Sequence, residues 1–224
     1  MPSTPSLTLY YHPLSSFCHK VLVALYENDI AFEARLIDLG NTKDRAELTA
    51  LWPLCKFPVI HDPERQRTVA ESSIIIEYLD QFFPAHSPLI PRDFDAALPV
   101  RFWDRVVDNH IHQPVQDIVL DQILGAKGNM GSARASIQTA YAMLDKQLAS
   151  SAWAAGQHFS LADCAAGPAL FYAHTLEPFP EQHLHLRAYF EKLIARPSVQ
   201  RVLTEAKPYF AMYPFHSAIP ARFL

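Results

Sequence analysis

The sequence is poor in the residues on which several classes of protein depend. Its 224 residues include three cysteines, and an odd, sparse set of cysteines does not make a disulfide framework. Its 19 lysines and arginines form no basic block and its formal net charge is −4, which argues against a nucleic-acid-binding surface. No apolar run reaches membrane-spanning length, and residues 1–6 show no basic patch followed by an apolar core. We therefore expect a cytoplasmic protein that binds neither nucleic acid nor a membrane.

Two further absences exclude common kinds of site. The chain has only six glycines, and none of them forms a glycine-rich phosphate-binding loop. His110 and His112 stand two residues apart, as do His183 and His185, so on a helix each pair would point to different faces and make no metal pair. We expect no metal ion. Because 50% of the residues are hydrophobic and 19% are charged, a packed soluble fold is expected.

The hydrophobic pattern of the first part of the chain alternates between strand and helix. Short apolar or alternating runs predict strands, and runs with helical spacing predict helices. The expected strands are 7–11, 32–37, 57–60 and 68–70, and the expected helices are 16–27, 42–51 and a third that follows Ser73. This order is that of a parallel strand pair with a helical crossover, followed by a hairpin and a helix, and it favours a small α/β domain.

The pattern changes near residue 84. Prolines punctuate a segment that makes a poor helix or strand, and they are Pro84, Pro88, Pro91 and Pro99. We place a linker there, at 85–96, between a first domain at 1–84 and a second at 97–224. The second domain has helical spacing, and we expect it to be all-α with an irregular tail from Pro208 onwards.

The most informative stretch of the first domain is the junction between its first strand and its first helix. Pro13 breaks the strand, and Ser15 and Ser16 stand where a helix N-cap belongs. Such a junction has free backbone N–H groups and the positive end of a helix dipole, so it can hold an anion such as a thiolate. The alternative is that both serines only cap the helix.

Two later segments offer further ligand-binding groups. A cis bond between Phe57 and Pro58 would turn the backbone of Phe57 outward, where it could pair with a peptide-like ligand, although a trans bond is the commoner state. Glu71 could take an α-ammonium group, and Ser72 with the following helix N–H groups could take an α-carboxylate. The alternative for the second segment is a capped helix with a surface glutamate.

Together these features resemble the glutathione S-transferase family over essentially the whole chain, and they indicate a serine-type, bacterial-like cytosolic member. Three motifs carry the resemblance, and they are S-S-F-C-H-K-V at 15–21, K-F-P-V-I at 56–60 and E-S-S-I-I-I-E-Y-L at 71–79. The resemblance implies a thioredoxin-like α/β N-terminal domain, an all-α C-terminal domain and a cytoplasmic homodimer. It also implies glutathione as co-substrate, no metal and a role in detoxification.

The resemblance also implies roles for individual residues. Ser15 would hydrogen-bond the glutathione sulfur and favour the thiolate, with Ser16 as its competitor because a one-residue shift of the helix start would exchange the two. Phe57, before the cis-proline Pro58, would pair with the cysteinyl part of glutathione. Glu71 and Ser72 would hold its γ-glutamyl end, and Lys56 would contact its glycine carboxylate or nearby backbone. An electrophile pocket between the domains would be lined by Tyr11, His12, Leu14, Phe102, Trp103 and Val106.

The cysteines depart from a redox pattern. Ser15 occupies the first position of what would be a Cys-x-x-Cys motif, and Cys18, expected in the core, keeps only the second. Cys55 stands where many members have a glycine or a polar ligand residue. A dithiol mechanism is therefore not expected, and the leading interpretation is a transferase that uses glutathione to attack a small, apolar electrophile. The alternatives are a glutathione-dependent peroxidase or isomerase with the same site, and a non-catalytic scaffold of the same fold.

Overall fold

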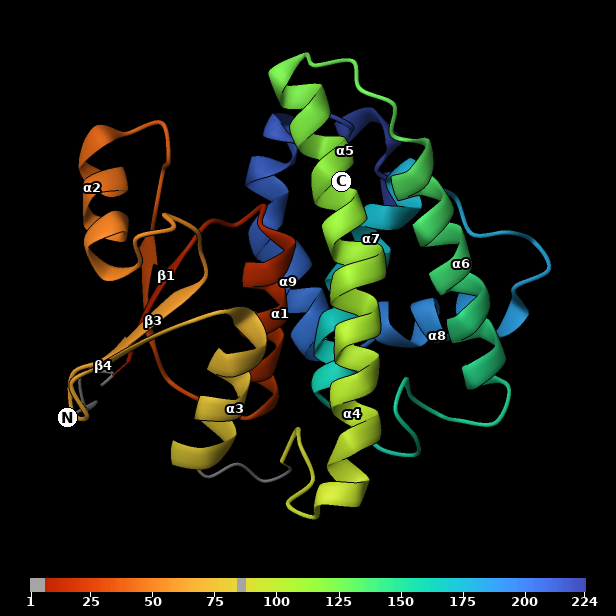
Figure 1. Cartoon of the computed structure of the whole chain (residues 1–224), viewed down its shortest axis with the longest axis horizontal. Coiled ribbons are helices and arrows are strands. Elements are labelled where there is room, and N and C mark those ends of the chain that lie inside the picture. Colours follow the sequence, from red (N-terminus) through yellow and green to blue (C-terminus); the bar gives the residue numbers. More distant parts are fainter. Residues whose placement is uncertain (1–6, 84–87) are drawn as a thin grey trace. The chain divides into compact units, whose positions relative to one another are not determined.

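The computed structural model describes residues 7–83 and 88–224, which divide between Pro88 and Leu89 into two compact units (Figure 1). The sequence places a linker at 85–96, and its first residues, 85–87, lie outside the described residues, as does Pro84. Its last three residues belong to helix α4 (Phe94–Val107), because the Asp93 side chain accepts a hydrogen bond from the Ala96 N–H at 2.9 Å and starts the helix there. Pro99 then lies within α4 and does not precede it.

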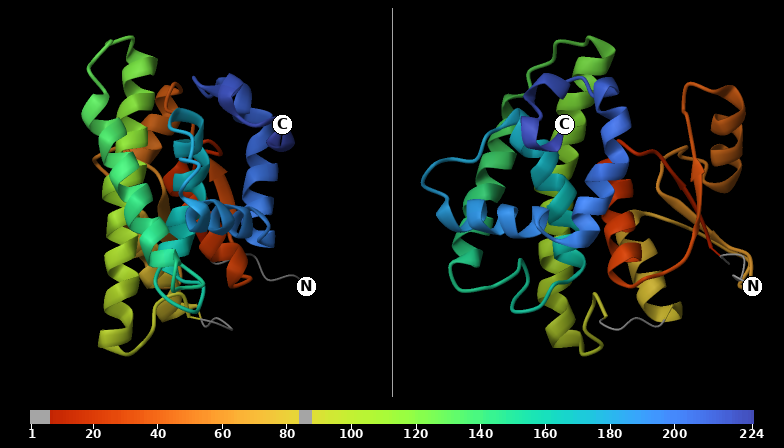
Figure 2. Two further views of the ribbon diagram at one scale, coloured as in Figure 1. Left: turned by 90° about the vertical axis from the view of Figure 1, so that its right-hand side faces the viewer. Right: turned by 180° about the vertical axis from the view of Figure 1, so that it is seen from behind.

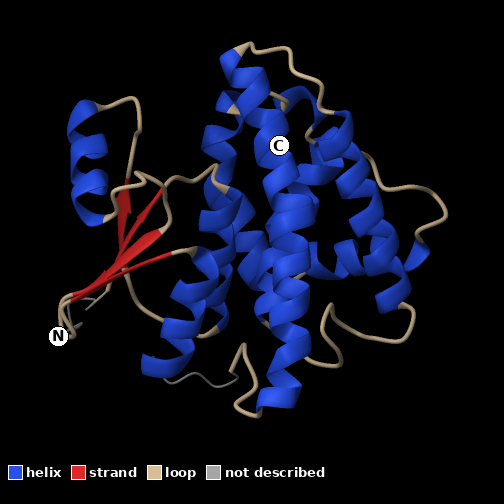
Figure 3. Ribbon diagram, in the orientation of Figure 1, coloured by secondary structure: helices blue, strands red, loops and turns tan. Residues whose placement is uncertain are grey.

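The described residues of the first unit form a four-stranded mixed sheet with three helices (Figure 3). Its elements are β1 (Thr8–Tyr11), α1 (Ser16–Glu27), β2 (Glu33–Leu36), α2 (Thr42–Leu51), β3 (Val59–Asp62), β4 (Arg67–Ala70) and α3 (Ser72–Phe82). The strand order is β2-β1-β3-β4, with β1 and β2 parallel and the other pairs antiparallel. The predicted crossover, hairpin and final helix are thus confirmed, and the arrangement is thioredoxin-like.

Helices cover both faces of this sheet. α1 and α3 pack against each other on one side of the strands, and α2 lies on the other side (Figures 1 and 2). Beneath α2, the fully buried side chains of Ile37, Leu48 and Val59 form a small core. The short apolar run that predicted β3 therefore corresponds to burial on both faces of that central strand, where Val59 and Ile60 are fully buried.

The second unit is helical, as the sequence predicts. After α4 come a π-helical turn, η1 (Asp108–His112), and helices α5 (Gln113–Leu124), α6 (Gly131–Leu148), α7 (Leu161–Leu176), α8 (Leu184–Ile194) and α9 (Pro197–Ala206). The tail forms three short 3₁₀ turns, η2 (Lys207–Met212), η3 (His216–Ala218) and η4 (Ala221–Phe223). Within residues 7–83 and 88–224, no helix combines the length and the apolar character that a membrane crossing requires.

Two prolines of this unit act differently from one another. Pro114 is the second residue of α5, two positions after the π-helical turn ends, and because proline has no N–H to donate, the helical bonding pattern changes shortly before it. Pro168 lies within α7 and does not end that helix. α7 is buried along nearly its whole length, as its apolar composition indicates.

The start of α7 is closed by a buried carboxylate. Asp163 accepts hydrogen bonds from the backbone N–H of Ala154 at 2.9 Å and of Ser160 at 2.8 Å. It also accepts from the hydroxyls of Ser160 at 3.0 Å and of Tyr189 at 2.6 Å. Burial raises the pKa of Asp163, and the hydrogen bonds oppose that rise. One side chain therefore ties together the loop before α7, the helix start and α8.

We predict that replacing this carboxylate destabilises the second unit severely. Asp163→Ala leaves several buried donors without an acceptor, so the free energy of unfolding should fall by about 3 kcal/mol or more. The matched control is Asp93→Ala, which removes an exposed cap from α4 and should cost about 1 kcal/mol. Urea unfolding followed by circular dichroism measures both, and equal losses in the two variants would contradict the prediction.

Candidate functional site

Three segments of the first unit meet at one edge of the sheet. Tyr10 of β1 pairs with Val59 of β3, and Val59 also pairs with Ala70 of β4. Because β3 is antiparallel to both neighbours, the residues that follow β1 and β4 lie beside those that precede β3. The register thus brings together the start of α1, the Phe57–Pro58 segment and the start of α3. These are the three motifs that the sequence singles out.

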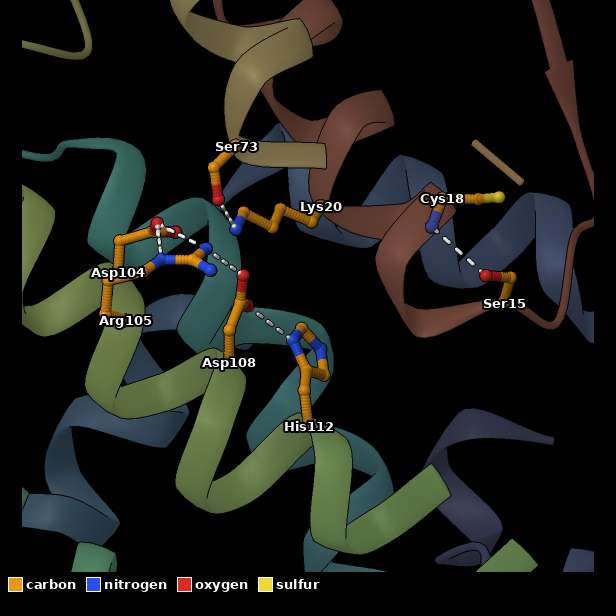
Figure 4. Close-up of polar contacts among 8 residues, drawn as sticks. All are labelled: Ser15, Cys18, Lys20, Ser73, Asp104, Arg105, Asp108 and His112. Atoms are coloured by element: carbon orange, nitrogen blue, oxygen red, sulfur yellow. Dashed lines mark hydrogen bonds and ion pairs between the residues drawn. The ribbon is translucent and has the colours of Figure 1, made fainter. Parts of the chain in front are cut away.

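The two adjacent serines have different environments. Ser15 is the N-cap of α1, and its half-buried hydroxyl oxygen accepts a hydrogen bond from the Cys18 N–H at 3.3 Å (Figure 4). Ser16 is the first residue of the helix, and only 2% of it is exposed. The hydroxyl of Ser15 is therefore the more accessible of the two at the positive end of the helix dipole.

A histidine that sequence reasoning left aside fixes this turn. The His19 side chain donates from Nε2 to the carbonyl oxygen of Pro13 at 2.5 Å, one turn into α1. On the other side of the turn, His12 Nδ1 accepts from the Leu14 N–H at 3.2 Å, and burial lowers the pKa of His12. The His12 ring also stacks on the ring of Phe57, with centroids 5.9 Å apart. These contacts hold the Ser15 turn against the proline segment.

The peptide bond between Phe57 and Pro58 is cis. Within residues 7–83 and 88–224, neither the N–H nor the carbonyl of Phe57 has a hydrogen-bond partner, so both backbone groups can pair with a ligand. Lys56 beside it is exposed. Cys55 has a φ of 51°, in the left-handed region that favours glycine, and its half-buried thiol donates to the carbonyl of Arg45 at 3.8 Å.

The start of α3 has an unusual backbone. Glu71, its N-cap, has a φ of 68°, a left-handed conformation in which a non-glycine residue stores about 1–2 kcal/mol of strain. No side chain of the described residues caps this helix, so its first N–H groups are available to an anion, and the Glu71 carboxylate is exposed above them. Ser72 follows and is 6% exposed.

A buried lysine of α1 contacts the first turn of α3. Lys20 is fully buried, and its ammonium donates to the Ser73 hydroxyl at 2.8 Å, which connects α1 to the first turn of α3 (Figure 4). Sequence reasoning gave Lys20 no role, although it belongs to the first motif. The contact couples the two helix starts that frame the site.

The thiol of Cys18 is unreactive. It is fully buried, and burial raises the pKa of its thiol to about 12, against the smaller lowering effect of its contacts with Ser15 and His12. A thiol in this state supplies almost no thiolate at neutral pH. The position is therefore a core position, as the sequence predicts, and the unit offers no dithiol pair there.

The six residues predicted to line the electrophile pocket divide between the units. Tyr11, His12 and Leu14 are half-buried in the first unit. In the second unit Phe102 and Val106 line a cavity of about 360 Å³ together with His110, Ser136, Thr139, Ala140 and Met143. Trp103 is 7% exposed and does not line that cavity. That all six residues line one pocket stays a prediction.

A group of charged side chains lies at the end of α4 and in the π-helical turn, where Asp104, Asp108 and His112 are buried and Arg105 is exposed. The Arg105 guanidinium donates to Asp104 at 2.8 Å and to Asp108 at 2.5 Å, and His112 Nδ1 lies 3.0 Å from the other Asp108 oxygen (Figure 4). These contacts link side chains of α4 to side chains of the π-helical turn that follows it. In the part of the chain that the structure describes, no group of three or more histidine, cysteine, aspartate or glutamate side chains could hold a metal ion.

Comparisons with known proteins agree with this geometry. The family model for "Glutathione S-transferase, N-terminal domain" matches residues 14–81, and that for "Glutathione S-transferase, C-terminal domain" matches residues 77–192. The chain is 29% identical over 197 residues to "Glutathione S-transferase-like protein FUS3" of Gibberella fujikuroi, an alignment that covers 85% of this chain and 92% of that one.

Solved structures give the same result. The chain resembles a glutathione S-transferase of Methylobacterium radiotolerans in complex with glutathione sulfonate, with a TM-score of 0.74, 27% identity and coverage of 88% and 93% of the two chains. It also resembles a glutathione S-transferase of Methylobacillus flagellatus with glutathione bound, with a TM-score of 0.74, 25% identity and coverage of 88% and 98%.

Proposed function

The chain belongs to the glutathione S-transferase family, and we propose that it activates the thiol of glutathione for attack on a small, apolar electrophile. The observation that carries this proposal is the meeting of three complementary groups at one sheet edge. These are a hydroxyl at a helix start, a backbone segment without partners and an uncapped helix start beneath a carboxylate. A scaffold without activity would need none of these groups, so their joint presence favours an enzyme.

In the proposed reaction Ser15 acts on the sulfur. The Ser15 hydroxyl oxygen accepts from the Cys18 N–H. The hydroxyl hydrogen is therefore available to form a hydrogen bond with a thiolate. That hydrogen bond and the positive end of the α1 dipole favour the thiolate over the thiol. The thiolate attacks the electrophilic carbon, a carbon–sulfur bond forms, and the leaving group departs with its electron pair. No covalent bond to the protein is needed.

The remaining residues of the site would hold the rest of glutathione. The partner-free N–H and carbonyl of Phe57, next to cis Pro58, can pair with the backbone of the cysteinyl residue. The Glu71 carboxylate can bind the α-ammonium, and Ser72 with the α3 N–H groups can bind the α-carboxylate. The exposed ammonium of Lys56 can meet the glycine carboxylate.

We also propose that the protein acts as a homodimer. Phe94, Leu98 and Phe102 recur every four residues on α4, and their exposed fractions are 68%, 53% and 52%. Met143 of α6 is 40% exposed, and Ile74 on α3 of the first unit is 53% exposed. Apolar stripes of this kind mark interaction surfaces, and a two-fold contact between copies would cover α3 of one with the second unit of the other. This stripe favours an interface role for Phe102 over a role in binding the electrophile.

The first prediction from the proposed function concerns glutathione binding. Isothermal titration should show saturable binding of reduced glutathione that Glu71→Ala weakens about tenfold or more, because a charge-assisted contact to the ammonium is lost. Ser15→Ala should retain binding, since Ser15 contacts the sulfur and not the charged ends. Glu64→Ala, which removes an exposed carboxylate from the β3–β4 turn, is the matched control. Absence of heat and of thermal stabilisation at millimolar glutathione would refute the proposal.

The second prediction concerns the pH dependence of catalysis. Without the Ser15 hydroxyl the bound thiolate loses a donor, so the pKa of the glutathione thiol should rise. The pH of half-maximal kcat with an activated aryl chloride should then move upward by about one unit or more in Ser15→Ala. Ser15→Thr, which keeps a hydroxyl, should retain most of the wild-type profile. An unchanged profile in Ser15→Ala would show that another group activates the thiol.

The third prediction concerns assembly. Light scattering should give wild type twice the 25.3 kDa mass of the chain, and Leu98→Glu should reduce it to one chain mass, because a charge in an apolar interface is strongly unfavourable. Met212→Glu is the control, since Met212 is 67% exposed and lies off the stripe. A wild-type protein of single-chain mass would contradict the homodimer.

A further inference from the structure

Lys20 is a charged residue in a fully packed part of the fold. It belongs to the stretch of α1 from Cys18 to Leu25, in which every residue is buried, and its own side chain is fully buried. Lysine is almost never buried in this way unless its ammonium has a partner, because removing a charge from water is costly. An apolar side chain would satisfy the packing of α1 at this position, so the cation indicates a further role.

The ammonium of Lys20 lies at the first turn of α3. It donates to the Ser73 hydroxyl at 2.8 Å, and Ser73 is the second residue of that helix (Figure 4). The first N–H groups of a helix have no acceptor within the helix, and no side chain of the described residues caps α3. The ammonium therefore adds a full positive charge to the partial positive charge that the α3 dipole places at the same end.

Charges of opposite sign are thus associated with this one helix turn. Glu71, the N-cap, is exposed to solvent, whereas Lys20 is buried within the protein. An α-amino acid group carries the complementary pair, since a positive ammonium and a negative carboxylate are attached to the same carbon. The turn can therefore recognise both the charges of such a group and the direction in which it lies.

Burial makes the charge of Lys20 effective beyond its direct contact. Two charges attract each other more strongly when protein surrounds them than in water, because the effective dielectric constant of protein is lower. Lys56, which is proposed to meet the glycine carboxylate, is exposed, so solvent and salt screen its charge. A buried cation next to the α3 start therefore distinguishes a carboxylate from a neutral group better than an exposed one does.

We propose that Lys20 determines the specificity of the site for a free α-carboxylate on the γ-glutamyl residue of the thiol peptide. The carboxylate binds to the first N–H groups of α3 and to the Ser72 hydroxyl, and Lys20 attracts it through its charge from within the protein. Ser73 holds the ammonium in place. The inference rests on the proposed function, because it requires that glutathione binds at the start of α3. It adds that thiol peptides with a neutral group in place of this carboxylate bind weakly.

The test compares two ligands in isothermal titrations of the full chain. One is reduced glutathione, and the other is its analogue with a carboxamide in place of the γ-glutamyl α-carboxylate. We expect wild type to bind glutathione about a hundredfold more tightly than the amide, and Lys20→Met to lower this ratio to about tenfold, because the charge is lost and the side-chain length is kept. Both affinities are measured on the same variant, so a partial loss of folded protein affects them equally and leaves their ratio unchanged.

Three further variants accompany Lys20→Met. Lys20→Arg keeps the charge and should retain more of the ratio than Lys20→Met does. Ser73→Ala removes the acceptor that holds the ammonium and should lower the ratio in the same direction, so the test does not depend on one variant. Lys43→Met removes an exposed lysine from α2 and is the matched control, which should leave both affinities unchanged.

The outcomes separate this inference from the proposed function. If wild type binds glutathione and Lys20→Met weakens both ligands by the same factor, Lys20 has only a structural role, and the inference is overturned while the proposed function stands. The same conclusion follows if Lys20→Met changes neither affinity. If wild type binds neither ligand up to millimolar concentration, the proposed function fails and the inference fails with it.

Discussion

The pairing of one strand with two neighbours is the constraint on which the candidate site depends. Val59 of β3 is paired with Tyr10 of β1 on one side and with Ala70 of β4 on the other, and this register fixes where β1 ends, where β3 begins and where β4 ends. A slip of one residue would reverse the faces of the strand side chains and move the Phe57–Pro58 segment away from the two helix starts. The site is therefore a property of the sheet as much as of the residues in its three loops.

The starts of α7 and α3 differ in how their backbone donors are paired. The paired start of α7 serves stability, and the unpaired start of α3 is suited to binding a ligand. At α7 a buried carboxylate satisfies the donors around the helix start, and the helix is fixed in place. At α3 no described side chain caps the first turn, and Glu71 is held in a strained backbone conformation above it. Strained and incompletely paired groups in an otherwise well-paired fold are typical of places where a ligand completes the structure.

Much of the fold and the positions of the three motifs within it were predictable from the sequence because the signals are local. Alternation and helical spacing identify buried faces, and the motifs at 15–21, 56–60 and 71–79 fall in the three loops that the register unites. The sequence could not give the left-handed backbone of Cys55 and Glu71, because side chains other than glycine disfavour it. It also missed the contact of Lys20 with Ser73, which joins residues far apart in the chain, and the position of Pro99 inside α4. Such features depend on tertiary packing, which periodicity does not encode.

The residue types at positions 15 and 18 determine whether this part of the site can be oxidised. Two thiols at these positions could be linked by an oxidant and would need a reductant to recover. Here the first position is a hydroxyl that accepts from the backbone N–H of Cys18, the second is a buried thiol with a pKa of about 12, and no redox couple exists between them. If the reactive sulfur arrives with glutathione, oxidants consume a replaceable co-substrate and leave these two positions unchanged. The output of the enzyme then follows the cellular supply of reduced glutathione, so the site reports the redox state of its surroundings without being changed by it.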